Sequence, residues 1–365
     1  MRKKKTETAR ADVLPVLDVE DYLSQIEFRE DDFEFMHQNE EALIDRNFSS
    51  QSYWRDALVR FKKNKGAVAS LICILLIIIL AIIGPHMNSY TYAEQEVKNQ
   101  NMAPRVQGLE KLGIMDGAET IKTAGGTKKV SKYESDDKKG VYYWFGSDSL
   151  GRDIWTRTWT GTRISLYIAV VAVLVDMLFG LSYGLISGFF GGKVDMVMQR
   201  IVEIVNSIPT LVVVTLMMLV LSPGLTSITV ALIVTGWIGM SRIARAEMLK
   251  LKEREFVLAS RTLGAKSFRI IFGEIFPNIF GSVITQTMFS IPHAIFTEAF
   301  LAFIGLGVPS PLASLGTMIS DGYKNFTTHS YQIIFPLLVM SLLMLSFTLL
   351  ADGLREAFDP KMKEM

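Results

Sequence analysis

The segment Gly66-Ala-Val-Ala-Ser-Leu-Ile-Cys-Ile-Leu-Leu-Ile-Ile-Ile-Leu-Ala-Ile-Ile-Gly-Pro85 contains twenty residues and no charged side chain. Twenty helical residues, rising about 1.5 Å each, match a bilayer core about 30 Å thick. A helix that is apolar on every face has no surface suited to water, so this segment belongs inside a membrane. We therefore predict a first transmembrane helix over residues 66–86.

Four further stretches are almost free of charge, although the whole chain is close to neutral. The 365 residues include 38 Lys and Arg and 37 Asp and Glu, giving a net charge of +1, and the mean hydropathy is +0.28. The four stretches are 164–192 with only Asp176, 204–241 with no charge, 275–320 with only Glu298, and 325–351 with no charge. Because the elements of a water-soluble globule need a polar face, these stretches exclude that class of protein.

The stretch 204–241 is too long for a single span, and Ser222-Pro223-Gly224 near its middle is expected to end a helix and turn the chain. A further proline, Pro277, stands at a favoured first-turn position for the span that follows it. We therefore predict an all-α integral membrane protein with six transmembrane helices. Their expected positions are 66–86, 164–188, 205–221, 226–243, 278–303 and 331–351.

The orientation of these spans follows from the Lys and Arg residues in the short connecting segments. Five precede the first span and eight lie between the fourth and fifth spans, whereas the turn between the third and fourth has none. Cytoplasmic segments are enriched in Lys and Arg, while long loops cross the membrane regardless of charge. Both termini and the loop 245–277 are therefore expected in the cytoplasm, and 87–162 is expected to be a large extracellular insertion.

The polar segments complete the predicted domain organisation. Residues 1–52 combine a basic start with an acidic stretch, which is typical of a partly disordered cytoplasmic tail. Residues 53–65 place apolar side chains on one helical face and cations on the other, which indicates an interfacial helix contacting membrane lipid. The insertion has turn signals at Asp116-Gly117 and Gly125-Gly126 and no visible catalytic spacing. The transmembrane core is expected over 163–353 and a cytoplasmic tail over 354–365.

Several functional classes are disfavoured by composition. Without a one-sided basic field, nucleic acid is not expected as a partner. The lone Cys73 can form no internal disulfide, and the four scattered histidines show no metal-ligand spacing. The nearest approach to a phosphate-binding loop, Gly191-Gly192-Lys193-Val194, has Val where Ser or Thr would hold Mg²⁺. Any ATP must therefore be hydrolysed by another chain.

Two patterns occur in the second predicted span. Gly180, Gly184, Gly188 and Gly192 recur every four residues and form one stripe, which permits close helix packing or a subunit contact. Gly180-Leu-Ser-Tyr-Gly184 also matches the GxSxG pattern of serine hydrolases, so an intramembrane protease using Ser182 with His293 as base is an alternative. The strand-turn-helix context of a nucleophile elbow is absent, which disfavours this alternative.

Asp176 and Glu298 are the two acids inside predicted spans. Carboxylates at membrane depth are costly and usually face a bundle interior or a wet cavity. Pore lining, a proton relay and a buried hydrogen bond are all open, and Glu298 could also lie near enough to the outer surface to be hydrated. These acids keep a proton-coupled secondary peptide transporter as an alternative function.

The predicted cytoplasmic loop has a helix, a break and a second helix. The pattern predicts a helix from Lys250 to Leu263, a break at Gly264, a second short helix, and Pro277 at the start of the fifth span. Within the first helix, Phe256, Leu258, Ala259 and Leu263 form an apolar face that needs cover. A charged helical projection with such a face is suited to docking against a soluble partner.

At this loop the chain resembles the permease subunits of ABC importers, specifically the second (C-type) permease of the oligopeptide and dipeptide family. The family signature is Glu-Ala-Ala, three residues, Gly, nine residues, then Ile-x-Leu-Pro. Its seven positions here are Leu258, Ala259, Ser260, Gly264, Glu274, Phe276 and Pro277, of which Ala259, Gly264 and Pro277 match. Further similar segments are Phe145-Gly-Ser-Asp-Ser-Leu-Gly-Arg-Asp153, Gly191-Gly-Lys-Val-Asp195, 297–307 and 351–360, and the insertion segment 102–117 is similar to Gram-positive permeases.

The resemblance implies a non-catalytic subunit with no cofactor of its own. It implies a heterodimer with a homologous permease, two cytoplasmic ATPase subunits that bind ATP and Mg²⁺, and an extracellular peptide-binding lipoprotein. The residues around 250–266 would form a coupling helix, with ATPase contacts expected at Glu255, Leu258, Ala259, Ser260, Leu263, Gly264, Ala265, Lys266 and Pro277. Gly151, Arg152 and Asp153 would belong to an extracellular family signature. The resemblance leaves oligopeptides, dipeptides, nickel chelates and related solutes open as substrates.

Overall fold

The computed structural model describes residues 53–358 except 124–125, 136–137 and 139. The predicted tail 1–52 and the chain from residue 359 onward lie outside the described residues. The helices of the described part are α3 (Tyr53–Lys63), α4 (Lys65–Ile83), α5 (Ile154–Val175), α6 (Leu181–Phe190), α7 (Gly192–Ser207), α8 (Thr210–Leu221), α9 (Leu225–Gly236), α10 (Ile238–Leu251), α11 (Glu255–Thr262), α12 (Phe276–Leu301), α13 (Leu315–Lys324) and α14 (Tyr331–Phe358).

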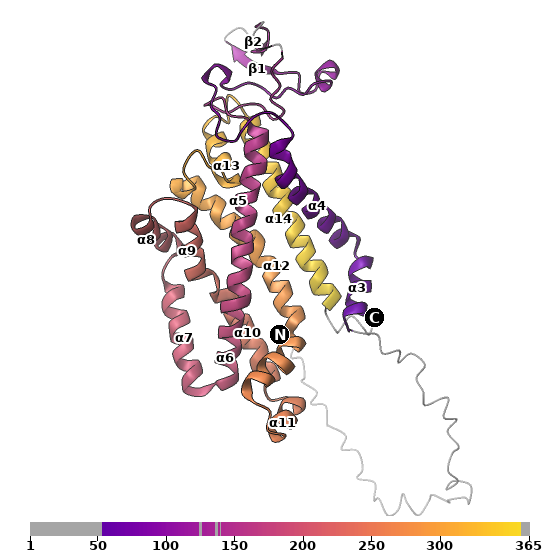
Figure 1. The fold of residues 1–365 in the computed structure, drawn as a ribbon, viewed down its shortest axis with the longest axis vertical. Coiled ribbons are helices and arrows are strands. Elements are labelled where there is room, and N and C mark those ends of the chain that lie inside the picture. The colour runs from indigo at the N-terminus through magenta and orange to yellow at the C-terminus, as the bar shows by residue number, and fades with distance from the viewer. Residues whose placement is uncertain (1–52, 124–125, 136–137, 139, 359–365) are drawn as a thin grey trace, which may run out of the picture. The chain divides into compact units, whose positions relative to one another are not determined.

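Several shorter segments join these helices. π-Helical turns occur at Asp176–Gly180, Arg269–Ile275 and Ala302–Leu306, and 3₁₀ turns at Gly84–His86, Val97–Asn99 and Leu109–Leu112. Five helical segments are long and apolar enough to cross a membrane, and the bent pair α7 and α8 gives a sixth if it counts as one span. Figure 1 shows α4, α5, α12 and α14 running along the bundle, with the insertion at one end and α11 at the other.

The second span begins earlier than the sequence predicts. Helix α5 starts at Ile154, because the Asp153 carboxylate caps it by accepting a 2.8 Å hydrogen bond from the backbone N–H of Thr156. Its polar first turns are buried against the insertion rather than exposed. The helix therefore begins before the predicted boundary at 162, and residues 154–162 form its first turns.

The third and fourth spans also differ from their predicted bounds. Helices α7 and α8 meet at Ile208-Pro209 with a bend of 79°, so the predicted single span 205–221 is the second arm of a longer broken segment. Proline lacks a backbone N–H and breaks a helix at this position. The fourth candidate span comprises α9 and α10 and ends at Leu251, beyond the predicted end at residue 243. Its last turns carry charged residues, which the absence of charge could not include in the predicted span.

The fifth and sixth spans are longer than predicted. Pro277 lies in the first turn of α12, as predicted, but the helical segment begins earlier, at Arg269, and runs to a kink at Gly305. The π-helical turn Arg269–Ile275 stands directly before this proline, where a wider turn accommodates the missing N–H. The sixth span, α14, extends to Phe358 rather than ending at Ala351, so the predicted boundary at 353 falls inside a helix.

The insertion contains a small β-sheet, so the all-α prediction holds for the bundle and is wrong for the insertion. Strands β1 (Ala118–Thr123) and β2 (Gly126–Ser131) pair antiparallel, with Ala118 opposite Ser131. The predicted turn at Asp116-Gly117 precedes β1: Gly117 has a φ of +78°, and a Cβ there would lie 2.6 Å from the ring of Tyr133. Tyr133, Tyr143 and Met102 form the buried core of the insertion.

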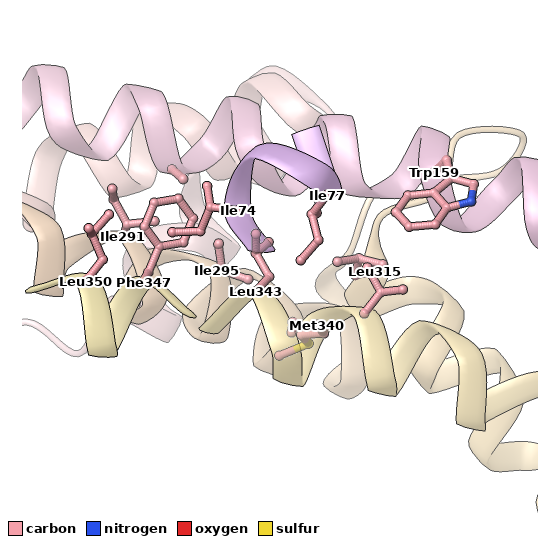
Figure 2. Close-up of a cluster of buried hydrophobic side chains, with 13 residues drawn as sticks. Ile74, Ile77, Trp159, Ile291, Ile295, Leu315, Met340, Leu343, Phe347 and Leu350 are labelled. Carbon is pink, nitrogen blue, oxygen red and sulfur yellow. The ribbon is translucent and has the colours of Figure 1, made fainter. Parts of the chain in front are cut away.

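The bundle core lies between α4, α5, α12, α13 and α14. Figure 2 shows Ile74 and Ile77 of α4 facing Leu343 and Phe347 of α14, with further contributions from α5, α12 and α13. Interdigitated side chains hold these helices together, because packing replaces water exclusion as the association force within a membrane. The remaining helices, α6 to α11, pack beside this core, and α7 to α10 line the cavity described next together with α5 and α12.

Candidate translocation cavity and docking helix

A cavity of about 580 Å³ opens beside the bundle core. Its lining comes from α5, the adjoining π turn, α7, α8, α9, α10 and α12. The lining residues are Ala172, Asp176, Asn206, Thr210, Leu232, Thr235, Gly236, Ile238, Gly239, Met240, Arg242, Gln286, Phe289, Ser290, His293, Ala294 and Thr297. This lining contains both polar and apolar side chains, so the cavity can hold a solute that combines both.

Asp176 is the acid of this cavity. It begins the π-helical turn Asp176–Gly180, and its side chain is 3% exposed. The Ser290 hydroxyl is a hydrogen-bonding neighbour of its carboxyl group. Its Oδ2 atom has no hydrogen-bond partner in the described part of the chain. The structure thus places Asp176 in a cavity with unused hydrogen-bonding capacity.

Helix α12 contributes a polar stripe to the same cavity. Gln286, Ser290, His293 and Thr297 follow one another at spacings of four, three and four residues, which places them on one helical face. Sequence reasoning missed this stripe, together with Asn206 and Thr210, because uncharged polar side chains do not interrupt an apolar run. The signal was present as the helical period of the polar positions.

Glu298 is separate from the cavity. Its side chain is fully buried, so a hydrated position near a surface is wrong. Its Oε2 atom accepts a 3.4 Å hydrogen bond from the Ser165 hydroxyl of α5, while Oε1 has no partner among the described residues. The two acids that the sequence groups together therefore occupy different environments: Asp176 faces a cavity, and Glu298 lies on α12 and faces Ser165 of α5.

Three glycines of the predicted stripe lie against α10. A Cβ at Gly184 would come within 2.2 Å of the Ser241 carbonyl oxygen, and the same close approach holds at Gly180 and Gly188. Gly192 does not belong to this stripe, because it lies beyond the end of α6, has a φ of +51° and meets only open space. Contact with α10 thus needs glycine at three of the four predicted positions.

The structure does not provide a nucleophile elbow. Ser182 lies in α6 within a continuous helical segment from Ile154 to Phe190. A nucleophile elbow requires a sharp turn between a strand and a helix, which exposes the serine hydroxyl. The GxSxG pattern arises here from the glycine spacing that packs α6 against α10.

Helix α11 projects from the opposite end of the bundle from the insertion (Figure 1). It is shorter than predicted, because the chain breaks at Lys252–Arg254 before Glu255 begins the helix. Val257 is fully buried and anchors the helix against α6, α10 and the start of the fifth span. The guanidinium of Arg261 also lies over the ring of Phe189, at 4.9 Å from its centroid.

The outward face of α11 and the turn after it are apolar. Leu263 is 87% exposed and Phe268 is 73% exposed, while Phe256 and Leu258 of the same surface are also exposed. Ala259 and Lys266 are exposed beside them, whereas Ser260 and Ala265 are half-buried. We call Phe256, Leu258, Leu263 and Phe268 the α11 surface.

Gly264 ends α11 and redirects the chain. Its φ of +82° lies in the left-handed region that favours glycine, and the backbone N–H of Ala265 donates to the Ser260 carbonyl at 3.0 Å. Nothing lies within 4 Å of the position that a Cβ would occupy. Backbone conformation, rather than space, therefore requires glycine here. Pro277 is not part of the α11 surface, since it lies inside the fifth span.

The predicted extracellular signature has a structural role at the insertion end. A Cβ at Gly151 would lie 1.9 Å from the Glu96 carbonyl oxygen, so only glycine lets these two segments meet. The side chain of Arg152 donates to Asp148 Oδ2 at 2.6 Å. Asp153 caps α5 and also accepts a hydrogen bond from Asn88 at 2.8 Å. Together they fasten the insertion to the start of α5.

A helical bundle with five or six candidate membrane spans, a cavity with polar lining and an exposed projecting helix is the architecture of a multi-pass membrane protein. The family model described as binding-protein-dependent transport system inner membrane component matches residues 180–364. The model described as the N-terminal TM domain of oligopeptide transport permease C matches residues 52–104. The chain belongs to the family of binding-protein-dependent transport system inner membrane components.

Individual relatives extend this similarity along the chain. The oligopeptide transport system permease protein OppC of Bacillus subtilis (strain 168) is 43% identical over 315 residues, covering 86% of this chain and 92% of the relative. The dipeptide transport system permease protein DppC of the same organism is 39% identical, covering 86% and 88%. A solved structure of the MetNI methionine ABC transporter in an inward-facing conformation aligns with a TM-score of 0.46 at 19% identity, covering 55% of this chain and 94% of that chain.

Proposed function

We propose that this chain is a permease subunit of an ATP-driven oligopeptide importer. Family membership and the two permease relatives support the transport class and peptides as the substrate class. The cavity that contains Asp176 would form this subunit's share of the translocation pathway. A homologous second permease would complete the pathway, and an extracellular peptide-binding lipoprotein would deliver the substrate.

The α11 surface carries the proposal of coupling to an ATPase. Its apolar side chains are exposed although they belong to a helix that Val257 and Arg261 hold against the bundle. Exposed apolar patches mark sites of protein contact. Two cytoplasmic ATPase subunits, which would bind ATP and Mg²⁺, are the proposed partners, one of them on α11. Closure of the ATPases would then move α11 as a rigid body and open the pathway to alternate sides.

This assignment also proposes an orientation. The α11 end and both termini would lie in the cytoplasm, in agreement with the Lys and Arg residues around α11. The insertion would lie outside the cell, where a binding protein can reach it. The subunit itself would perform no catalysis, and the peptide would cross without covalent change.

Replacing Gly264 with Val tests the coupling role. A β-branched residue is strained at a φ of +82°, so the turn after α11 should rearrange. We expect ATPase subunits to co-purify at least tenfold less with Gly264→Val, and ATP-dependent peptide uptake to fall in proportion. The matched control is Gly273→Val in the following turn, where the φ is not left-handed and the nearest contact of a Cβ is 3.7 Å away. Normal assembly and uptake with Gly264→Val would contradict the proposal.

The proton-coupled alternative predicts a different result. A secondary transporter would take up peptide with this chain alone, in the absence of ATP, and neutralising Asp176 or Glu298 would block it. The proposed importer requires two permeases and two ATPases. Reconstitution of the chain with and without these partners therefore separates the two functions.

A further inference from the structure

The cavity contains a carboxylate whose hydrogen-bonding capacity is only partly used. Asp176 is 3% exposed, and its Oδ2 atom has no hydrogen-bond partner in the described part of the chain. An ionised carboxylate in a low-dielectric environment is costly unless a cation or several donors compensate it. An acid of this kind at membrane depth is best explained by a ligand that supplies the missing partner.

The backbone around Asp176 holds this carboxylate in a fixed place. The residue begins the π-helical turn Asp176–Gly180, and such turns are frequent at functional sites. At the other end of this turn, a Cβ on Gly180 would lie 2.7 Å from the Trp237 carbonyl oxygen. The helix therefore packs closely against the start of α10 at Gly180, one turn after Asp176.

The remaining lining defines the kind of cation that fits. Among the described residues no group of three or more His, Cys, Asp or Glu could hold a metal ion. Hydroxyl and amide groups of Ser290, Gln286 and Asn206 share the cavity with Asp176 and can accept further hydrogen bonds. A primary ammonium has three N–H donors and suits one carboxylate surrounded by neutral acceptors.

The cavity also contains groups of the opposite character. Arg242 and His293 belong to its lining, so the site is not uniformly acidic. A volume of about 580 Å³ lies within the usual range of small-ligand sites, about 300–1,000 Å³. A zwitterionic chain with an ammonium at one end, apolar and amide groups between, and a carboxylate at the other end matches this mixture.

We propose that Asp176 binds the α-ammonium group of the peptide as it crosses the permease. This inference rests on the proposed function, and it assigns to this chain a selectivity step separate from that of the binding protein. The carboxylate would form a charge-assisted hydrogen bond to the peptide's first residue, with Ser290 and Gln286 as neighbouring acceptors. An N-terminally blocked peptide lacks the charge and would gain nothing from Asp176.

The experiment compares a peptide with its N-acetylated form in the complete transporter. The assembled complex is reconstituted in proteoliposomes with the binding protein and ATP, and uptake of both peptides is measured at saturating binding protein. We expect Asp176→Asn to lower the ratio of free to acetylated uptake at least tenfold relative to the wild type. Because the binding protein is unchanged, any shift in this ratio belongs to the permease.

Two further variants complete this test, one as a substitute if Asp176→Asn gives little complex and one as a control. Asp176→Ser is a smaller neutral replacement and should give the same loss of the ratio if Asp176→Asn yields too little complex. Glu298→Gln is the matched control, because Glu298 is equally buried and also has an unpartnered oxygen but does not line the cavity. It should leave the ratio within twofold of the wild type.

The outcomes separate this inference from the function on which it rests. An equal loss of uptake of both peptides in the neutral Asp176 variants would overturn the role of Asp176. An equal change in the uptake ratio in Glu298→Gln would overturn it as well. Neither result would contradict the proposed importer function. ATP-independent uptake, or no uptake of either peptide by the wild-type complex, would overturn the importer and this inference with it. A selective loss of the free peptide supports both.

Discussion

The two ends of the bundle differ in which side chains they bury. At the insertion end, Arg152 and Arg157 are buried, and both contact the carboxylate of Asp148, at 2.6 Å and 3.7 Å. At the α11 end, Leu263 and Phe268 are large apolar side chains left exposed. The insertion end therefore pairs its buried arginines with a carboxylate of its own, although it also exposes apolar side chains such as Leu112. The α11 end leaves apolar surface uncovered, which suits an exchangeable contact.

The largest expected effect tests the insertion end. Asp148→Asn removes the negative charge nearest to Arg152 and Arg157, and uncompensated buried cations destabilise a fold by about 3 kcal/mol. We expect the thermal unfolding midpoint of the purified complex to fall by several degrees. Asp321→Asn is the control, because Asp321 is 4.0 Å from Arg152 and half-exposed. Equal effects of the two variants would remove the distinction between a buried and a peripheral partner.

The next effect tests the α11 end. Leu263→Glu adds a charge to the α11 surface without touching the buried anchor, so the stability of the chain should change by less than about 0.5 kcal/mol. Co-purification of ATPase subunits should fall at least tenfold, or about 1.4 kcal/mol. The control is Leu112→Glu on the insertion, where Leu112 is similarly exposed. If both variants retain their ATPases, the α11 surface is not the docking site.

A smaller effect concerns the anchoring of α11. Arg261→Gln removes the guanidinium above Phe189, a contact worth about 0.5–1 kcal/mol. Backbone amides of α11 should then exchange hydrogen several-fold faster, while those of α14 keep their wild-type rates. Arg254→Gln, a change of the same kind just before α11, should leave exchange unchanged. Unaltered exchange in Arg261→Gln would mean that Val257 alone holds the helix.

The smallest effect concerns an exposed ion pair on the insertion. Lys129 donates a 2.5 Å hydrogen bond to Asp116 and holds the pKa of that carboxyl below its usual range. Because the folded pKa is below the unfolded one, this stability is present at neutral pH and disappears as the pH falls through the folded value, below about 4.

Lys129 is mostly exposed, so solvent screens the pair. Lys129→Gln should therefore lower the free energy of unfolding at pH 7 by less than about 1 kcal/mol. Thermal melts at pH 7 and at about pH 3 measure this difference. A difference that persists in acid would show that the lysine stabilises the insertion by means other than this carboxyl.

The sequence predicts the positions of the membrane-spanning helices better than it predicts where each helix begins and ends. Absence of charge located the five long spans and the α8 arm of the bent pair, because a helix inside a membrane needs an apolar surface all round. It misplaced their ends, because Thr156, Arg157 and the other polar residues of the first turns of α5 are covered by the insertion, which no local pattern reveals. The bend at Pro209 was missed for a related reason: the apolar run before it was shortened by Glu203.

The candidate sites divide in the same way. The exposed α11 surface could be predicted, because four apolar positions on a charged loop form a face on any helix. Asp176 and Glu298 could not be told apart, because both are single acids in apolar runs. Only the arrangement of α10 and α12 decides that one lines a cavity and the other lies buried beside Ser165.

The continuous segment from Ile154 to Phe190 has a mechanical consequence. Its 37 residues make a rod of about 55 Å at about 1.5 Å per residue. It begins directly after Asp153, the residue that caps α5 and contacts the insertion. Near its other end, the ring of Phe189 lies beneath the guanidinium of Arg261 of α11. A lever arm of this length converts a tilt of about 5° into a displacement of about 5 Å at its far end. A tilt at the α11 end is therefore transmitted along one helical segment to the insertion end, without any loop between them.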